Sequence, residues 1–203
     1  MAHKPTKGDP GRFDRRYYQR FYRDPATRVT TPREIERLAN FVDAYLRYLQ
    51  LPVKRVLDAG CGLGYWHRAL AKLRPQARYT GIELSPYLCQ RYGWIKASVV
   101  DYRPRGRFDL VICQGVLQYL DAQQASAAIE NLAGLCRGVL YLEVLTAEDW
   151  AEHCDRGASD GDVHRRPAAF YRRRLGKHFR CLGGGLWLNR EAPTVLYTLE
   201  TAD

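Results

Sequence analysis

The sequence predicts an α/β protein with a doubly wound, mostly parallel sheet of seven strands, the last of them antiparallel. Three observations support this. Short apolar runs alternate with helical segments from residue 32 onward, a pattern typical of a parallel sheet covered on both faces. The first run ends in a glycine-rich turn at residues 60–64. Near the C-terminus, two strand-like segments are joined by a link short enough for a hairpin.

The helices and strands are expected in order from residue 32. Thr31 and Glu34 form a capping box with Pro32 at the first helical position, and the helix they open ends before Pro52. Strands are expected at residues 54–59, 78–83, 94–99, 108–113 and 139–144. Helices are expected at residues 66–73, 85–92 and 121–136.

The C-terminal part departs from this alternation. A helix near residues 167–177 precedes two strands, at residues 179–188 and 194–200, with a hairpin link at residues 189–193. Three consecutive glycines, residues 183–185, interrupt the first of these strands. They indicate either a bulge or a close approach of another backbone.

Length and composition limit the class of protein. The chain has 203 residues, which at about 150 residues per domain predicts one domain. Hydrophobic residues make up 46% and charged residues 27%, which excludes a disordered or collagen-like chain. No apolar run approaches the ~20 residues that span a bilayer, and the N-terminus lacks a secretory signal. Six cysteines without a CxxC pair favour reduced thiols. We therefore expect a cytoplasmic protein with no membrane association.

The net charge of +10 is concentrated near the N-terminus, where residues 1–37 hold ten Lys/Arg against five Asp/Glu. We expect residues 1–31 to form a basic aromatic arm or lid. Residues 14–23 predict a short helix in which arginines alternate with four aromatic residues, Tyr17, Tyr18, Phe21 and Tyr22. Three roles fit this pattern: a lid over a ligand, an RNA contact through stacking and phosphates, or a helix packed on the core.

The glycine-rich turn predicts a binding site. Glycines let the backbone turn sharply and approach a ligand closely, and the helix N-terminus behind them suits a carboxylate or phosphate. Glu83 ends the next strand nineteen residues after Gly64. That is near the ~20-residue offset at which an acidic side chain accepts hydrogen bonds from ribose hydroxyls. The pattern predicts a nucleoside with an anionic tail.

The same residues disfavour a dinucleotide. The dinucleotide fingerprint would require a glycine where Tyr65 stands. Asp58, two residues before the turn, would repel a diphosphate and can receive an ammonium group. An enzyme that uses NAD is therefore a distant alternative.

Four ordered motifs resemble the class I S-adenosylmethionine (SAM) dependent methyltransferases. Residues 56–66 resemble motif I of that family, and Glu83 in TGIELS resembles its ribose-binding acid. Asp101 in ASVVDYRP resembles the acid that binds the adenine amino group. Residues 108–120, FDLVICQGVLQYL, are similar to its fourth-strand motif. The resemblance covers about residues 32–200 and implies a Rossmann-like methyltransferase domain over residues 32–203.

The resemblance also implies the cofactor, SAM, with S-adenosylhomocysteine (SAH) as the product. Asp58 and the glycines would hold the methionine part, Glu83 the ribose, and Asp101 with its neighbours the adenine. Main-chain atoms near Gln114 would meet the methionine part. The full set of implied cofactor contacts is Asp58, Gly60, Cys61, Gly62, Gly64, Glu83, Leu84, Val100, Asp101, Tyr102, Gln114 and Gly115.

The acceptor side is less specified, because the family has no fixed catalytic residue. A general base is needed only where the acceptor arrives protonated. His153 and His164, in a polar loop after the fifth strand, are candidates for a base or an orienting group. Tyr22, Tyr119 and Trp150 are candidate substrate contacts, with Tyr119 standing where many small-molecule members carry histidine. Alternatively, this loop holds a metal or is a plain surface loop. Because no recognised metal-ligand spacing occurs in it, we expect no metal.

These observations favour a methyltransferase that acts on a small molecule. The fourth strand lacks the (D/N)PPY motif of enzymes that methylate adenine or glutamine amino groups. Two alternatives remain: methylation of RNA or protein through the basic arm, and a SAM-binding protein without catalysis. The motifs specify neither the acceptor nor the oligomeric state.

Overall fold

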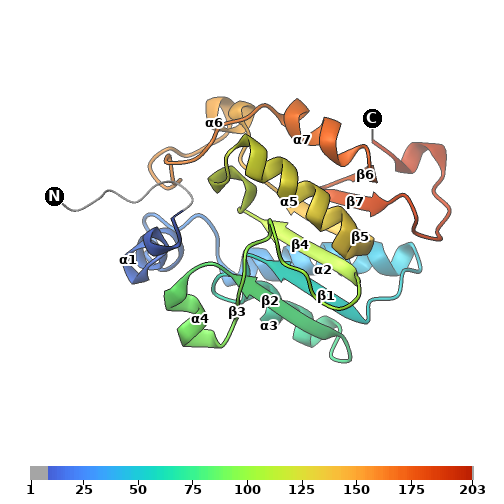
Figure 1. The fold of residues 1–203 in the computed structure, drawn as a ribbon, viewed down its shortest axis with the longest axis horizontal. Helices are drawn as coiled ribbons and strands as arrows, with labels where there is room; N and C mark the ends of the chain where they lie inside the picture. Colours follow the sequence, from blue (N-terminus) through green and yellow to red (C-terminus); the bar gives the residue numbers. More distant parts are fainter. Residues whose placement is uncertain (1–8, 203) are drawn as a thin grey trace.

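The computed structural model describes residues 9–202, which form one seven-stranded sheet covered by helices (Figure 1). The strand order is β3-β2-β1-β4-β5-β7-β6. The strands are β1 Arg55–Ala59, β2 Arg78–Glu83, β3 Ile95–Lys96, β4 Phe108–Gln114, β5 Cys136–Glu143, β6 Phe179–Gly183 and β7 Leu186–Asn189. The first five strands pair in parallel, and β7 is antiparallel to both β5 and β6. The predicted doubly wound sheet with an antiparallel last strand is confirmed.

Two of the expected helices, α2 and α5, begin with side-chain caps. Thr31 and Glu34 form the predicted capping box, and Asp121 accepts the backbone N–H of Gln124 at 2.8 Å. The helices are α1 Arg15–Tyr18, α2 Pro32–Tyr48, α3 Tyr65–Leu73, α4 Pro86–Tyr92, α5 Ala122–Leu135, α6 Ala147–Glu152 and α7 Ala168–Leu175. Four short helical turns complete the set: η1 Pro10–Arg12, η2 Gln19–Arg23, η3 Leu117–Tyr119 and η4 Thr198–Glu200.

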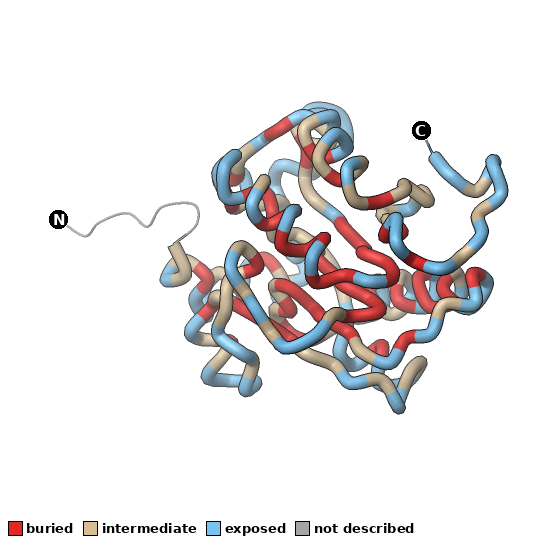
Figure 2. Tube along the Cα trace, turned by 45° about the vertical axis from the view of Figure 1, so that its right-hand side comes forward, coloured by how far each residue is buried: buried red, intermediate tan, exposed pale blue. Residues whose placement is uncertain are grey.

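The central strands are buried on both faces, as the red segments of Figure 2 show. Because side chains alternate along a strand, neighbouring residues of β4 enter different cores. Val111 packs in the core on the side of α5 and α7, whereas Leu110 and Ile112 pack in the core on the side of α2 and α3. The sheet therefore has a packed core on each of its faces.

The C-terminal strands differ from the expectation. Residues 179–188, expected as one strand, form two strands joined by a turn, because residues 183–185 have φ values of +78°, +57° and +79°. A Cβ on Gly185 would lie 3.1 Å from the carbonyl oxygen of Leu142, so this glycine also permits a close approach. The strand expected at residues 194–200, as the hairpin partner of the preceding strand, was wrong. β7 is the partner of β6 instead, and residues 198–200 form η4. The third strand is shorter than expected, at residues 95–96.

Asp109, at the second position of β4, ties the amino ends of neighbouring strands together. Its side chain accepts the backbone N–H groups of Lys54 and Arg55, each at 2.8 Å, and the Nε of Arg137 at 2.7 Å. Burial alone would raise the pKa of this carboxyl group. The hydrogen bonds outweigh burial, and the pKa of Asp109 lies below its ordinary value.

We expect Asp109→Asn to lower the free energy of unfolding by about 1–3 kcal/mol at pH 7, because it weakens three charge-assisted hydrogen bonds, each of them partly buried. A depressed folded-state pKa gives stability that is present above the unfolded pKa of about 4 and lost as the pH falls through the folded value. Urea unfolding at pH 7 and pH 3 should therefore give a smaller difference between the two proteins at pH 3. An equal difference at both pH values would contradict this role.

Candidate functional site

Two positions of the glycine turn after β1, Gly60 and Gly64, have no room for a side chain. Gly60 and Cys61 both donate backbone N–H groups to the carbonyl of Ile82, at 2.9 and 3.1 Å. Gly60 has φ +79°, and a Cβ there would lie 2.3 Å from a methyl group of Val116. Gly64 caps α3 with φ +69°. Glycine is therefore required at these positions both by the backbone conformation and by the close packing.

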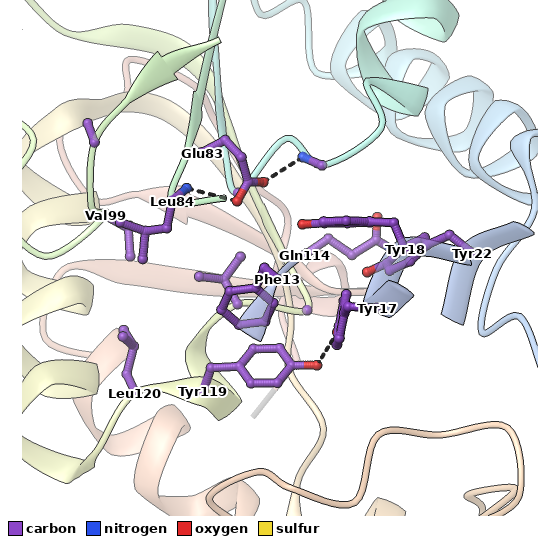
Figure 3. A pocket seen from close by; sticks show the side chains of 15 residues that line it. Phe13, Tyr17, Tyr18, Tyr22, Glu83, Leu84, Val99, Gln114, Tyr119 and Leu120 are labelled. Atoms are coloured by element: carbon purple, nitrogen blue, oxygen red, sulfur yellow. Dashed lines mark hydrogen bonds between the residues drawn. The ribbon is translucent and has the colours of Figure 1, made fainter. Parts of the chain in front are cut away.

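Glu83, at the end of β2, is fixed by the backbone around it (Figure 3). Its Oε2 accepts the N–H of Gly62 at 2.9 Å, and its Oε1 accepts those of Leu84 and Ser85 at 2.8 and 2.9 Å. The residue is only 6% exposed. Burial raises the pKa of Glu83, and the three hydrogen bonds oppose that shift. Since a carboxylate offers about four lone-pair sites, the side chain keeps capacity for a ligand hydroxyl.

A cavity opens at the carboxyl ends of the strands, where open α/β sheets bind ligands. Its first part lies next to the carboxylate of Glu83, and we call it the Glu83 lobe. The Glu83 lobe is lined by Phe13, Tyr17, Tyr18, Tyr22, Gly60, Gly62, Glu83, Leu84, Ala97, Val99, Gln114, Gly115, Val116, Tyr119 and Leu120 (Figure 3). Of the predicted cofactor contacts, Gly60, Gly62, Glu83, Leu84, Gln114 and Gly115 therefore lie together around it.

A second part, the Asp160 lobe, adjoins the first and shares several of its walls, including Gly60, Gln114 and Tyr119. It adds aromatic, acidic and polar side chains. The residues found only here are Phe21, Val29, Thr30, Ile35, Asp58, Cys61, Leu63, Tyr65, Trp66, Gln118, Glu143, Leu145, Ser159 and Asp160.

Asp58 is almost completely buried, at 2% exposure. Burial raises its pKa to about 7, the hydrogen bond from the hydroxyl of Tyr79 lowers it, and the nearby charge of Glu83 raises it. A cation placed in the Asp160 lobe would favour the ionised form. Asp58 is thus suited to receive an ammonium group.

The side chain of Gln114 is held in one orientation at the end of β4. Its Oε1 accepts the indole N–H of Trp66 at 2.7 Å, and its Nε2 donates to Glu143 at 3.0 Å. Tyr141 also donates to Glu143, at 3.1 Å. Gln114 and Gly115, the latter with φ +67°, line both lobes.

The predicted adenine contacts are not brought into the cavity. Asp101 is exposed and lines neither lobe, and Val100 and Tyr102 pack against the core as half-buried residues. Ala97 and Val99, from the preceding residues of the same segment, line the Glu83 lobe in their place.

Both candidate histidines lie outside the two lobes. His153 is exposed beside Glu152 at the C-terminal end of α6, a helix that the sequence pattern did not predict. His164 lines a separate depression, and its backbone N–H donates to Gln118. Trp150 packs under the guanidinium of Arg165, 4.1 Å from its ring centre, and also lines neither lobe. Of the predicted acceptor contacts, only Tyr22 and Tyr119 reach the cavity.

The N-terminal arm supplies residues that the motifs did not indicate. Phe13, Tyr17 and Tyr18 line the Glu83 lobe beside Tyr22. Phe13 meets the ring of Tyr119 edge-on at 5.1 Å between centroids. Phe13, Tyr18 and Phe21 are 8%, 5% and 8% exposed, so the arm forms a packed wall of the cavity. Residues 1–8 of the predicted arm lie outside the described residues.

Three further features bear on the kind of site. Within residues 9–202, no group of His, Cys, Asp and Glu side chains is arranged to hold a metal ion. No helix in that range has the length and apolar character needed to cross a membrane. All six cysteines carry free thiols.

A glycine turn, the helix behind it and a fixed acid at the end of the second strand define a nucleoside-binding α/β site. A family model described as "Methyltransferase domain" matches residues 18–185. The chain belongs to this family.

The names of similar curated proteins give different methyl acceptors. The chain is 36% identical over 110 residues to a ubiquinone biosynthesis O-methyltransferase of Xanthomonas campestris, a match that covers 47% of this chain and 44% of the relative. It is 32% identical over 85 residues to a malonyl-[acyl-carrier protein] O-methyltransferase of Legionella pneumophila, covering 36% and 30%. The chain thus matches less than half the length of these curated relatives.

Solved structures have the same fold. Magnesium protoporphyrin IX methyltransferase of Synechocystis, crystallised with bound SAH, superposes with a TM-score of 0.57 at 23% identity, covering 79% of this chain and 80% of that one. At this identity the likeness establishes the Rossmann-like methyltransferase fold.

Proposed function

We propose that this protein is a SAM-dependent methyltransferase that acts on a small molecule. One observation carries the proposal: Glu83 is held by the N–H of Gly62 from the glycine turn, at the edge of a cavity that both elements line. This arrangement fits a ribose with an amino-acid tail, because the acid can accept from ribose hydroxyls and the turn lets the tail approach the backbone closely. Family membership and the SAH bound to the Synechocystis enzyme support the choice of cofactor.

The residues of the cavity fit SAM chemically. Glu83 has acceptor capacity for ribose hydroxyls, and Asp58 would pair with the ammonium group. The backbone of Gly60, Gly62 and Gly115 gives the close approach that the methionine part needs, with Cys61 and Gly64 completing the turn. We propose that Leu84, Ala97 and Val99 provide the apolar wall for the base, a place that the motifs assigned to Val100, Asp101 and Tyr102.

Bound SAM would supply an electrophilic methyl group on a sulfonium. The chain then has to orient the acceptor in line with that group and keep water out. Tyr17, Tyr22 and Tyr119 line both lobes, so they lie where cofactor and acceptor would meet. We assign them to orienting the acceptor.

The packing of the arm favours a small-molecule acceptor over RNA. Stacking on RNA bases needs exposed aromatic faces, and Phe13, Tyr18 and Phe21 are buried against the cavity. Both named relatives act on acceptors other than nucleic acid. The arm then acts as a cover of the site.

The pKa of Asp58 predicts how SAH affinity depends on pH. Because its pKa is about 7, Asp58 is increasingly protonated below that value and loses the charge that would receive the ammonium group. We expect the affinity for SAH to fall as the pH drops from 8 to 6, by about tenfold for each unit below the pKa at the limit. Calorimetric titration at both pH values tests this. In Asp58→Asn the pH dependence should disappear; if it persists, Asp58 is not the responsible group.

Ligand-dependent unfolding tests the proposed function. A ligand that binds only the folded state stabilises it in proportion to RT ln(1 + [L]/Kd). SAM and SAH should raise the midpoint of thermal unfolding and NAD should not, and methyl-labelled SAM should label small molecules in a mixture. Stabilisation by NAD alone would overturn the proposal, and SAM binding without methyl transfer to any acceptor would favour a non-catalytic protein.

A further inference from the structure

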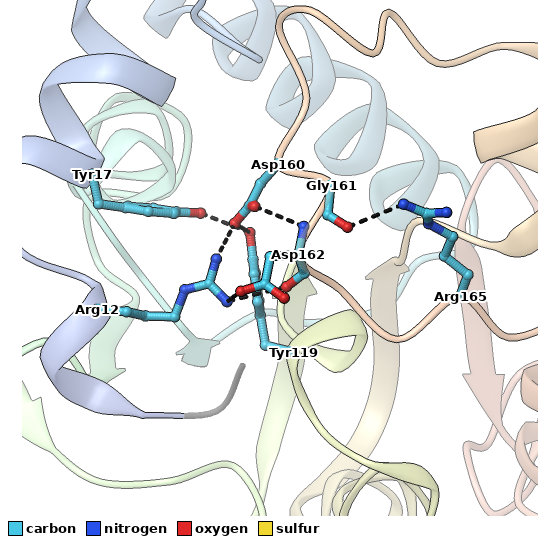
Figure 4. A network of polar contacts seen from close by, with 7 residues as sticks. All are labelled: Arg12, Tyr17, Tyr119, Asp160, Gly161, Asp162 and Arg165. Carbon is cyan, nitrogen blue, oxygen red and sulfur yellow. Dashed lines mark hydrogen bonds and ion pairs between the residues drawn. The ribbon is translucent and has the colours of Figure 1, made fainter. Parts of the chain in front are cut away.

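Four side chains from three distant parts of the chain form one polar network beside the cavity (Figure 4). Arg12 of the arm lies 2.8 Å from Oδ2 of Asp160, and the hydroxyl of Tyr119 donates to the same oxygen at 3.1 Å. The hydroxyls of Tyr17 and Tyr119 are 2.7 Å apart. The Arg12 and Asp160 side chains are only 11% and 12% exposed. Tyr17, Tyr119 and Asp160 all line the Asp160 lobe, so the network borders the space for the acceptor.

The direction of each hydrogen bond follows from the number of hydrogens. A phenol has one O–H hydrogen, and Tyr119 gives its own to Asp160. The hydrogen between the two phenols is therefore that of Tyr17. Burial raises the pKa of both phenols well above 10, so both keep their hydrogens at neutral pH. The oxygen of Tyr17, which has no other partner within residues 9–202, can then only accept a hydrogen bond from a ligand.

Other side chains of the Asp160 lobe add further hydrogen-bond acceptors. Gln118 is 8% exposed and lines the Asp160 lobe, and its Oε1 has no hydrogen-bond partner within the described part of the chain. Glu143 and Asp58 add carboxylates. No lysine, arginine or histidine between residues 9 and 202 lines either lobe. A hydroxyl or an amine would supply the hydrogen that the Tyr17 oxygen and Gln118 Oε1 lack, whereas an ionised carboxylate has no hydrogen to donate.

We propose that the methyl acceptor is a hydroxyl or amine nucleophile, and that Tyr17, Tyr119 and Asp160 carry its proton away from the reacting centre. This inference rests on the proposed methyl transfer. The acceptor oxygen or nitrogen bonds to the methyl carbon while the methyl–sulfur bond breaks and its electron pair stays on sulfur. The acceptor passes its proton to Tyr17. Tyr17 passes its own proton to Tyr119, and Tyr119 passes its own proton to Asp160. Asp160 is a positioning residue that acts through Tyr119, and its ion pair with Arg12 holds its side chain in place.

The class of acceptor is tested with methyl-labelled SAM and one mixture of aromatic phenols, alcohols, amines, carboxylates and thioethers, with products identified by mass. We expect labelled ethers or N-methyl amines. Labelled methyl esters or sulfonium products, from a protein that binds SAH, would overturn this inference and leave the proposed methyltransferase intact. Failure to bind SAH would instead remove the proposed function itself. SAH binding without any labelled product would count against the methyl transfer and would remove this inference with it.

The role of Asp160 is tested on the best acceptor of that mixture. Asp160 faces Arg12, Asp162, Tyr119 and, through Tyr119, Tyr17. Asp160→Asn keeps Oδ1, which accepts the backbone N–H of Asp162 at 3.0 Å, but it removes the proton-accepting charge. We expect kcat to fall about 100-fold at pH 7, the scale of general base catalysis, with little change in KM. The deficit should shrink as the pH rises toward the pKa of the acceptor, because an acceptor that has already lost this proton needs no relay. Tyr17→Phe should behave in the same way.

Asp162→Asn is the matched control. Asp162 also pairs with Arg12, at 3.1 Å, but its side chain is 49% exposed and it lines neither lobe. We expect kcat to stay near that of the wild type. Equal losses in Asp160→Asn and Asp162→Asn, or a loss in Asp160→Asn that is the same at every pH, would assign Asp160 to holding the arm and would overturn the relay.

Discussion

Replacing Gly60 with alanine is expected to abolish measurable SAH binding, with a loss of at least about 100-fold, or ~2.7 kcal/mol. The added Cβ would lie 2.3 Å from a methyl group of Val116, and the residue would have to keep φ +79°. Either the glycine turn or the loop that carries Val116 must move, and both line the Glu83 lobe. Calorimetric titration with SAH measures the effect.

Gly93→Ala separates backbone strain from the steric clash. Gly93 ends α4 with φ +71°, and a Cβ there would meet no atom within 4 Å. This variant should lose about 1 kcal/mol of stability from the left-handed conformation and keep its affinity for SAH. If Gly60→Ala bound SAH as well as Gly93→Ala does, the glycine turn would not be the binding element.

The second large effect is expected for Glu83→Ala. It removes the acceptor for ribose hydroxyls and leaves the N–H groups of Gly62, Leu84 and Ser85 without their partner. We expect SAH affinity to fall at least tenfold, ~1.4 kcal/mol, and the free energy of unfolding to fall by about 1–3 kcal/mol for each donor left buried and unpaired.

The matched control is Glu152→Ala, which removes a carboxylate that is 68% exposed beside His153. Its affinity and stability should match the wild type. Chemical denaturation of both variants shows whether enough folded Glu83→Ala remains for the titration. Wild-type affinity in a folded Glu83→Ala would show that the ribose is bound elsewhere.

The sequence predicted those parts of the fold and site that neighbouring elements encode. Asp58, Gly60 and Glu83 sit at the ends of two adjacent parallel strands, and strand pairing alone brings them to one edge. The capping box at Thr31 and the alternation of strands and helices are equally local signals. All of these depend on contacts within a few turns of chain or on the direction of parallel strands.

Features that depend on distant contacts were not predictable in the same way. Arg12 and Asp160 are 148 residues apart, and nothing in either segment indicates its partner. The hairpin turn at residues 183–185 could not be predicted without knowing that all three glycines adopt positive φ, because the pattern also allowed a bulge. His153 was expected near the site because it follows a strand, but an unpredicted helix, α6, lies between that strand and His153, and the histidine at its end is exposed.

Calorimetric titration of the wild-type protein with SAH tests the central claim most directly. The account predicts one binding site with a micromolar Kd, about −8 kcal/mol, with an affinity that decreases from pH 8 to pH 6. Absence of binding by the folded wild-type protein would contradict both the assignment of the cavity to SAM and the methyl transfer that depends on it.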